Sequence, residues 1–270
     1  MESREFVKII WIMWYQGFDH APAIVQKCVQ TWEKHHPDWQ INKLSAQNVS
    51  DYIDVEELLP GYKEKNIHIE ALCNVIRVGL LSKYGGVWAD STLYCNRSLN
   101  TWLPEYISNS GFFAFAKPGP DRMMSNWFLA SYPGNYIAAK CLEGCQKYWL
   151  GRHERDQYFW FHYMFADIYQ NDIKFKECWD LTPELSADAP HSFLSYDDTF
   201  FIPLTHRIKK FIDKTDIPLF KLTHKYNKEA AKEDSVVYYL INGKIKRSFI
   251  DKIKYFIKDQ TNTKDQQKVF

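Results

Sequence analysis

The segment 84–92, YGGVWADST, places one carboxylate and two hydroxyl groups directly after a short apolar run. In open α/β sheets, ligands gather beyond the carboxyl ends of the strands. Asp90 at such a strand end, with Thr92 beside it, could hold Mg²⁺ or Mn²⁺ on a diphosphate, because both ions take oxygen ligands. Alternatively, Gly85 and Gly86 only end a helix, and Asp90 only caps a turn.

A polar stripe crosses the strongly apolar helix that the sequence predicts over residues 67–83. Glu70, Asn74 and Arg77 recur at positions i, i+4 and i+7, which puts them on one face of that helix. A guanidinium in apolar surroundings must be paired, and Glu70 is one candidate partner. The alternative is that Asn74 and Arg77 face a ligand crevice and hold a sugar or phosphate group. A helix end, a Gly-Gly turn and a short strand would return Arg77 and Asp90 to one cleft.

An aromatic loop follows the first apolar run of the chain. Trp14, Tyr15 and Gln16 come directly after residues 7–13, at the place where a nucleotide-binding fold would put an aromatic side chain on the base. The alternative is that Trp14 belongs to the core.

A cationic segment, KLTHK, lies near the end of the part expected to be catalytic. Lys221, His224 and Lys225 could neutralise a leaving diphosphate. The alternative is that this segment is only the solvated end of a strand. Asp156 and His162 lie among aromatic residues, where each is a weaker candidate.

Apolar periodicity predicts a chain in which strands and helices alternate, which is typical of an α/β fold with a parallel sheet. The first three predicted elements are a strand, a helix and a strand. Expected strands cover residues 7–13, 39–44, 87–89, 112–116 and 219–225, and expected helices cover residues 22–35, 48–59, 67–83, 135–150 and 158–169.

The composition is that of a folded chain without a strong charge bias. The chain has 270 residues, of which 46% are hydrophobic, and a net charge of +1. This charge argues against nucleic-acid binding, which needs a marked basic excess. The six cysteines lack the spacing of a zinc site. The first residues lack the apolar stretch of a signal peptide, and no apolar run is long enough to span a membrane. We therefore expect a cytoplasmic protein.

Several stretches, taken in order, resemble a known family of enzymes. They are KIIWIMWYQG, PDW, ALCNVIRVGLLSKYGGVWADST, NWFLASYPGN and KLTHK. They resemble the capsular polysaccharide synthesis group of glycosyltransferases, which is allied to glycosyltransferase family 32 with its DXD sugar-binding motif. The resemblance covers roughly residues 6–227, and segment 84–92 with its upstream arginine is the most specific part.

The resemblance implies a GT-A fold, a Rossmann-like mixed sheet flanked by helices. It also implies a UDP- or GDP-sugar donor, a Mn²⁺ or Mg²⁺ ion, and transfer with retention of configuration. By position, Asp90 matches the first aspartate of the DXD motif, and Arg77 matches the family's arginine. Trp14 matches the aromatic residue that stacks on the base, and Asn126 matches an asparagine of the donor-side segment. Asn74 stands where many relatives have aspartate.

One position departs from the DXD pattern, because Thr92 stands where the last aspartate is expected. A carboxylate and a hydroxyl bind a hard cation less strongly than two carboxylates do, so we expect the ion to depend largely on the donor's phosphates. The aromatic-rich residues 111–132 and 158–195 are expected on the acceptor side, where Asp156 and His162 are the candidates.

The implied function is transfer of a sugar to a glycan or lipid-linked oligosaccharide in bacterial capsular or surface polysaccharide synthesis. Two alternatives remain open. A sugar-phosphate transferase would also use Asp90 and a metal, but it would release a nucleoside monophosphate. A non-catalytic carbohydrate-binding protein, which the 17% aromatic content favours, would have no affinity for nucleotides.

We expect one GT-A domain over residues 1–240, followed by a basic amphipathic helix and a polar tail over residues 241–270. Apolar residues at helical spacing alternate with lysines through residue 258. This face could rest on an anionic membrane surface, at the inner face of the cell membrane. Alternatively, the helix packs on the domain with its lysines in water.

Overall fold

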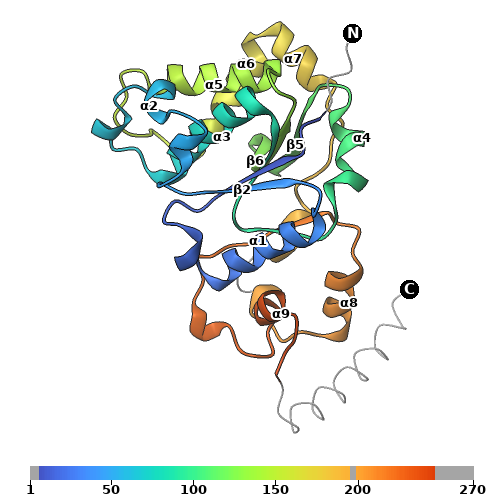
Figure 1. The fold of residues 1–270 in the computed structure, drawn as a ribbon. Coiled ribbons are helices and arrows are strands. Elements are labelled where there is room, and N and C mark those ends of the chain that lie inside the picture. The colour runs from blue at the N-terminus through green and yellow to red at the C-terminus, as the bar shows by residue number, and fades with distance from the viewer. Residues whose placement is uncertain (1–5, 195–198, 247–270) are drawn as a thin grey trace.

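Five strands form the central sheet of the computed structural model, which describes residues 6–194 and 199–246 (Figure 1). Their order is β2-β1-β3-β6-β5; β1 runs parallel to both neighbours, whereas β6 is antiparallel to β3 and β5. The predicted α/β class, a mixed sheet flanked by helices, is confirmed. The strands are β1 (Ile9–Met13), β2 (Gln40–Leu44), β3 (Gly86–Ala89), β5 (Phe112–Gly119) and β6 (Arg122–Ser131).

The side chains of the interior strand β1 alternate between two cores, so this strand is buried on both faces, as its continuous apolar run predicts. Trp11 and Met13 pack into the core on one side, and Ile10 and Ile12 into the core on the other. Helix α1 (Ala23–His35) contributes Trp32 to the second core. The first core lies under a group of helices: α3 (Ile69–Tyr84), α5 (Tyr136–Trp149), α6 (Trp160–Asn171) and α7 (Ile173–Asp180).

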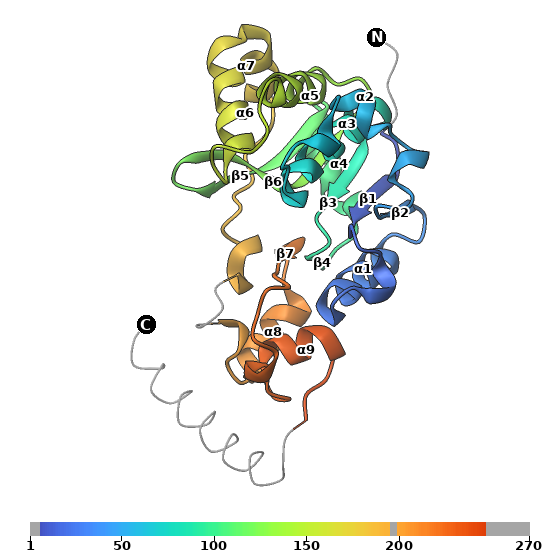
Figure 2. The same cartoon turned by 90° about the vertical axis from the view of Figure 1, so that its left-hand side faces the viewer.

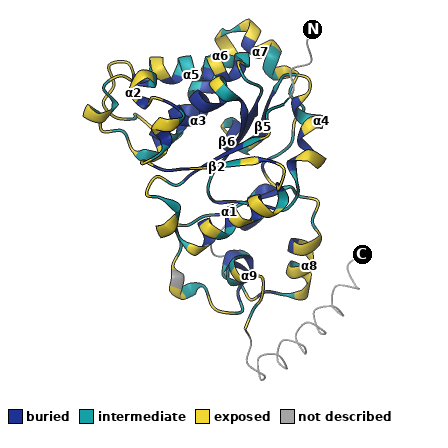
Figure 3. Ribbon diagram, viewed as in Figure 1, coloured by how far each residue is buried: buried dark blue, intermediate teal, exposed yellow. Residues whose placement is uncertain are grey.

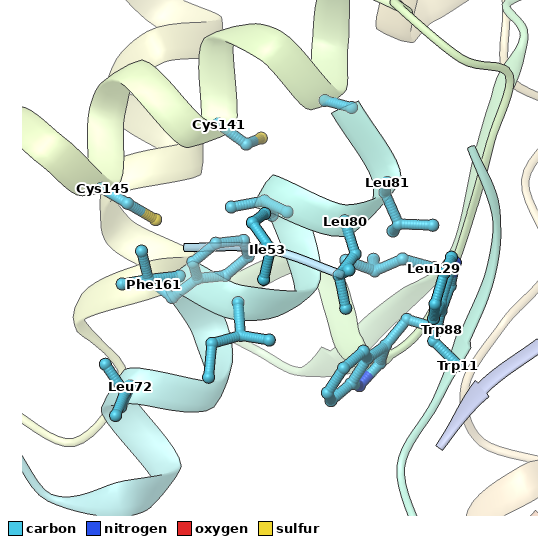
Figure 4. Packing of buried hydrophobic residues seen from close by; sticks show 14 of the residues in the cluster. Trp11, Ile53, Leu72, Leu80, Leu81, Trp88, Leu129, Cys141, Cys145 and Phe161 are labelled. Atoms are coloured by element: carbon cyan, nitrogen blue, oxygen red, sulfur yellow. The ribbon is translucent and has the colours of Figure 1, made fainter. Parts of the chain in front are cut away.

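Helix α3 is buried almost all round, which confirms the interpretation of its apolar sequence (Figure 3). In Figure 4, Leu72, Leu80 and Leu81 project from this helix among residues of the sheet and of α5. A helix enclosed in this way presents its few polar side chains only where a cavity or a partner receives them. Asn74 and Arg77 are the buried polar residues of α3.

Gly85 and Gly86 turn the chain from α3 directly into β3. Both have positive φ, 68° and 84°, a region that L-residues with a side chain rarely adopt. A Cβ atom on Gly86 would lie 2.5 Å from the carbonyl oxygen of Ile9 in β1. The glycine pair therefore ends the helix, as predicted, and also allows β3 to approach β1.

A second sheet of two antiparallel strands lies between the large sheet and two helices near the end of the described chain (Figure 2). It consists of β4 (Leu93–Cys95) and β7 (Leu219–Lys221), near α8 (His206–Lys214) and α9 (Val236–Asn242). A separate apolar cluster with residues from α1, α8 and α9 supports it. The strand predicted over residues 219–225 ends at Lys221 because its partner β4 begins at Leu93, opposite Lys221.

The helix predicted over residues 48–59 is two short helices. Asp54 interrupts it, because its carboxylate accepts hydrogen bonds from the backbone of Glu56 and Glu57 and so starts a new helix. The remaining helices are short: η1 (Phe18–His20), η2 (Val49–Asp51), α2 (Val55–Leu58), η3 (Tyr62–Glu64), η4 (Leu99–Thr101), α4 (Leu103–Ile107), η5 (Pro190–Phe193) and η7 (Lys228–Ala230).

The predicted boundary after residue 240 falls inside α9. This helix ends at Asn242, because Gly243 adopts a left-handed conformation with φ 68°. The basic helix predicted from residue 241 is therefore wrong for residues 243–246, and residues 247–270 lie outside the described residues. Within the described residues, no helix has the length and apolarity needed to cross a bilayer.

Candidate functional site

A cleft of about 760 Å³ opens beyond the carboxyl ends of β1 and β3. This is where ligands gather in open α/β sheets. One wall comes from the loop after β1 and from α3, and the other comes from β6 and the start of α6. Lys221 and the residues that follow it close one end. The cleft therefore joins segments that lie far apart in the sequence.

Asp90 lies at the end of β3, where a turn holds it in the cleft. Its backbone N–H donates to Trp127 O at 2.8 Å, and Leu93 N–H donates to Asp90 O at 2.9 Å. The indole Nε1 of Trp88 donates to Asp90 Oδ1 at 3.0 Å. Burial would raise the pKa of Asp90, but the charges of Lys221 and Arg77 and these hydrogen bonds hold it below the usual value. The carboxyl group is therefore ionised at neutral pH.

Arg77 pairs with Asp90 and not with Glu70, so the structural pairing considered for the polar stripe does not form. Its Nη2 lies 3.4 Å from Asp90 Oδ1, and its side chain is 6% exposed. Nε donates to Cys73 O at 3.1 Å, and Nη1 donates to Asn126 O. These contacts fix the guanidinium plane, because the five N–H groups of arginine have a rigid geometry.

Asn74 and Asn126 join the same network from α3 and β6. Asn126 Nδ2 donates to Asn74 Oδ1 at 2.8 Å, and both residues line the cleft. The Asn126 carbonyl accepts from Arg77 at the same time. The structure thus brings together four of the predicted residues, Asn74, Arg77, Asp90 and Asn126, although β6 itself was not predicted as a strand.

Lys221 reaches the other side of Asp90 from the end of β7. Its Nζ lies 3.1 Å from Asp90 Oδ2 and donates to Thr92 Oγ1 at 2.8 Å. The backbone holds it there, because Leu222 N–H donates to Thr92 O at 3.0 Å. Two cations, Arg77 and Lys221, thus flank the one carboxylate.

The aromatic loop and the KLTHK segment meet at one end of the cleft. Trp14 packs edge-on against His224, with ring centroids 5.0 Å apart. Trp14 also packs against the apolar cluster that supports β7, so its ring is partly a core residue, whereas stacking of a base on it stays a prediction. Tyr15 and Gln16 line the cleft beside Trp14, and Lys225 lines it beside His224.

His162 lines the cleft from α6 and has an unsatisfied ring nitrogen. Its side chain is buried, and Nδ1 has no hydrogen-bond partner. Burial, together with the charges of Arg122 and Arg77, lowers the pKa of His162 to about 4. The ring is therefore neutral at pH 7, and Nδ1 is a buried polar atom without a hydrogen-bond partner.

Asp156, the other acceptor-side candidate, does not line the cleft. Its carboxylate accepts a hydrogen bond from Tyr148 OH and lies 3.4 Å from Arg152 Nη1. Tyr148 belongs to α5, and these contacts turn Asp156 towards that helix. Its prediction as a catalytic residue has no support in this geometry.

Five further residues line the cleft that were not named as candidates, although four of them lie within the residues 111–132 and 158–195 expected on the acceptor side. They carry no motif, and the packing of α6 against β6 and of η5 against β7 helps to bring them here. They are Arg122, Arg155, Tyr158, Phe159 and His191. Arg122 is the most enclosed cation among them, with its guanidinium 4.0 Å from the centre of the Phe159 ring.

Positive charge dominates the cleft. The described residues that line it include five cations and two carboxylates, a surplus of three positive charges. The cations are Arg77, Arg122, Arg155, Lys221 and Lys225, and the carboxylates are Glu70 and Asp90. Histidines do not add to the surplus at neutral pH, because burial lowers the pKa of each one in the cleft. The cleft is therefore suited to a polyanion.

The side chains around Asp90 do not fit a divalent ion held by the protein. Such ions need several oxygen ligands, whereas the ammonium group of Lys221 occupies the side of Asp90 that faces Thr92. No group of three or more His, Cys, Asp or Glu side chains suited to a metal ion occurs in residues 6–194 and 199–246. The predicted Mn²⁺ or Mg²⁺ at Asp90 and Thr92 stays a prediction.

Most of the chain is similar to one protein family. The model of the family described as "Capsular polysaccharide synthesis protein" matches residues 1–240. This range includes every cleft residue described above and ends inside α9. The match covers well over half of the 270 residues.

Two curated fungal proteins are similar to part of the chain. O-glycosyltransferase braB of Annulohypoxylon truncatum is 27% identical over 161 residues, which cover 53% of this chain and 38% of that protein. Glycosyltransferase afumC of Aspergillus fumigatus is 29% identical over 156 residues, covering 52% and 38%. The matched part is thus little more than a third of each relative's length.

Two solved glycosyltransferase structures are distantly similar. The PaToxG glycosyltransferase has a TM-score of 0.41 at 14% identity, covering 65% of this chain and 76% of its own. The galactosyltransferase LgtC, in complex with donor and acceptor sugar analogues, has a TM-score of 0.40 at 10% identity, covering 91% and 99%.

Proposed function

Since the chain belongs to the capsular polysaccharide synthesis protein family, we propose that it is a glycosyltransferase of GT-A type with a nucleotide-sugar donor. One observation carries the proposal: Arg77 and Lys221 converge on Asp90 in a cleft with surplus positive charge. Cations fixed in advance stabilise the charge that develops on a leaving diphosphate. The names of the curated relatives braB and afumC support this activity.

The donor would lie along the cleft with its base at the aromatic loop. Trp14 and Tyr15 offer ring surfaces there, and Gln16 offers an amide. The diphosphate would lie beside Lys221 and Arg77, with Lys225 and His224 near its nucleoside end. Asn74 and Asn126, which hydrogen-bond to each other, would hold the sugar hydroxyls. A UDP- or GDP-sugar fits these contacts.

The acceptor would enter between the hairpin of β5 and β6 and the start of α6. Tyr158 and Phe159 offer aromatic faces at this end, and sugar rings pack on such faces. His162 is too weak a base for proton abstraction, because burial lowers its pKa to about 4. It would line the cleft as a neutral ring beside the acceptor hydroxyl. A glycan or a lipid-linked oligosaccharide presents such a hydroxyl.

In the proposed reaction, the bond from the sugar C1 to the diphosphate oxygen breaks, and the acceptor oxygen bonds to C1. With retention, the acceptor approaches from the face that the diphosphate leaves, and the hydroxyl proton passes to the departing phosphate. Arg77 and Lys221 would stabilise the charge on the leaving oxygen. Asp90 would hold both cations in place.

Nucleotide binding tests the proposal directly. UDP, GDP and their sugars are compared with ADP in a thermal unfolding assay, with and without Mn²⁺. Saturation with a cognate ligand stabilises the fold by about 3 kcal/mol, so we expect the melting temperature to rise by about 5 °C or more. Incubation of that donor with glycan acceptors should release a nucleoside diphosphate. Release of a monophosphate would instead identify a sugar-phosphate transferase, and no shift with any nucleotide would favour a carbohydrate-binding protein.

Replacing Trp14 with alanine should weaken nucleotide binding by about tenfold, since stacking of a base on an aromatic ring contributes about 1–3 kcal/mol. The matched control is Tyr158→Ala, which removes another exposed ring that lines the cleft. Titration of both variants with the nucleotide found in the unfolding assay measures the difference. Equal losses in the two variants would contradict a base site at Trp14.

A further inference from the structure

Lys221 occupies the position between two side chains that a divalent ion would need. Its ammonium nitrogen is 3.1 Å from Asp90 Oδ2 and 2.8 Å from Thr92 Oγ1. We propose that this ammonium, together with the Arg77 guanidinium, supplies the positive charge for the donor diphosphate, so that the nucleotide binds without a divalent ion. This inference rests on the proposed function and deepens it.

The backbone fixes Lys221 beside Thr92 before any ligand arrives. Lys221 is paired with Leu93 in the β4–β7 sheet, and Leu222 N–H donates to Thr92 O at 3.0 Å. The Lys221 side chain is 18% exposed and the Asp90 side chain 26%. The pairing of β4 with β7 thus places the ammonium group beside the carboxylate.

Both oxygens of the Asp90 carboxylate already have cationic neighbours. Arg77 Nη2 lies 3.4 Å from Oδ1, and Lys221 Nζ lies 3.1 Å from Oδ2. The hydroxyl of Thr92 also accepts from Lys221. A divalent ion at Asp90 and Thr92 would have to displace the ammonium and then lie close to the guanidinium, where like charges repel.

The cationic side chains of the site also provide positive charge for a diphosphate without a metal ion. Two cations on one carboxylate leave one positive charge at Asp90, and Arg122, Arg155 and Lys225 lie along the same cleft. A metal in a transferase of this kind neutralises the diphosphate and stabilises it as it leaves. Lysine can act in the same way as a point charge on phosphate. Thr92, in place of a second carboxylate, then serves as an acceptor for lysine.

Binding of UDP and GDP to the wild-type protein tests the proposal, because it needs no acceptor and no turnover. Isothermal titration is carried out in EDTA and again with Mn²⁺. We expect the two dissociation constants to agree within about twofold, since the fixed cations are present in both conditions. Binding by the wild type only with Mn²⁺ would overturn this inference and leave the proposed function standing. No binding in either condition would overturn both.

Two lysine-to-methionine variants separate the role of Lys221 from that of the general positive charge in the cleft. Lys221→Met keeps the length of the side chain, and we expect it to weaken binding in EDTA by about 10- to 100-fold. Mn²⁺ should restore part of this loss, because the ion can then reach Asp90 and Thr92. Lys225→Met is the matched control, since Lys225 is 71% exposed and lies 3.6 Å from Glu70. A loss in Lys221→Met no larger than in Lys225→Met would contradict the proposal.

Discussion

Replacing Asp90 with alanine is expected to abolish sugar transfer, lowering kcat/KM by about a thousandfold or more. The carboxylate holds Arg77 Nη2 at 3.4 Å and Lys221 Nζ at 3.1 Å. Without it, the two cations repel each other and leave the positions that match the diphosphate. Release of nucleoside diphosphate from the donor identified by thermal unfolding measures the effect.

The fold of the Asp90→Ala variant should survive, because Arg77 still donates to the carbonyls of Cys73 and Asn126. The lost pairing costs about 2 kcal/mol of unfolding free energy. Asp156→Ala is the control, since it removes an aspartate that lies outside the cleft. Near-normal turnover in Asp90→Ala, or an equal loss in Asp156→Ala, would be incompatible with this site.

The second large effect is expected on stability, from Gly86→Ala. The new Cβ would lie 2.5 Å from Ile9 O, in the interior strand β1. The φ angle of Gly86 is 84°. Neither the clash nor the backbone strain can relax without moving β3 away from β1. We expect the unfolding free energy to fall by more than about 3 kcal/mol, measured by denaturation with urea.

Gly134→Ala is the matched control for this substitution. Gly134 also has positive φ, 65°, but nothing lies within 4 Å of its added Cβ. It therefore carries only the cost of the left-handed conformation, about 1 kcal/mol. If the two variants lose the same stability, the close approach of β3 to β1 does not depend on Gly86.

Local pattern was enough to predict the elements that build the donor side of the cleft. Strand β1 and helix α3 could be predicted from their own residues, because each is apolar almost throughout. Such a run indicates burial on all sides whichever elements pack against it. The glycine pair at 85 and 86 marked the end of α3, because glycine readily adopts the positive φ that ends a helix. Local pattern was wrong where one residue outweighed periodicity, as when Asp54 starts a new helix.

Other elements could not be predicted from the local sequence pattern. β6 was recognised only as a stretch shared with a family and not as a strand. Residues 206–214 lie in a stretch rich in turn residues, yet they form the amphipathic helix α8. Its buried Ile212 packs into a cluster that exists only because α1, α9 and β7 meet there. Such helices are stabilised mainly by their packing, which the sequence does not display.

The sequence by itself determined the central features of this protein: the α/β alternation, the glycine turn, and the Asp90 that follows it. Tertiary structure decided the partners. Glu70 was the partner considered for Arg77 in the sequence, but packing pairs Arg77 with Asp90. Lys221 contacts the same carboxylate from 131 residues further along the chain. Contacts across such distances depend on strand pairing, here β4 with β7, which no local periodicity encodes. Residue type therefore identified the carboxylate, whereas only the fold placed a lysine where a metal ion was predicted.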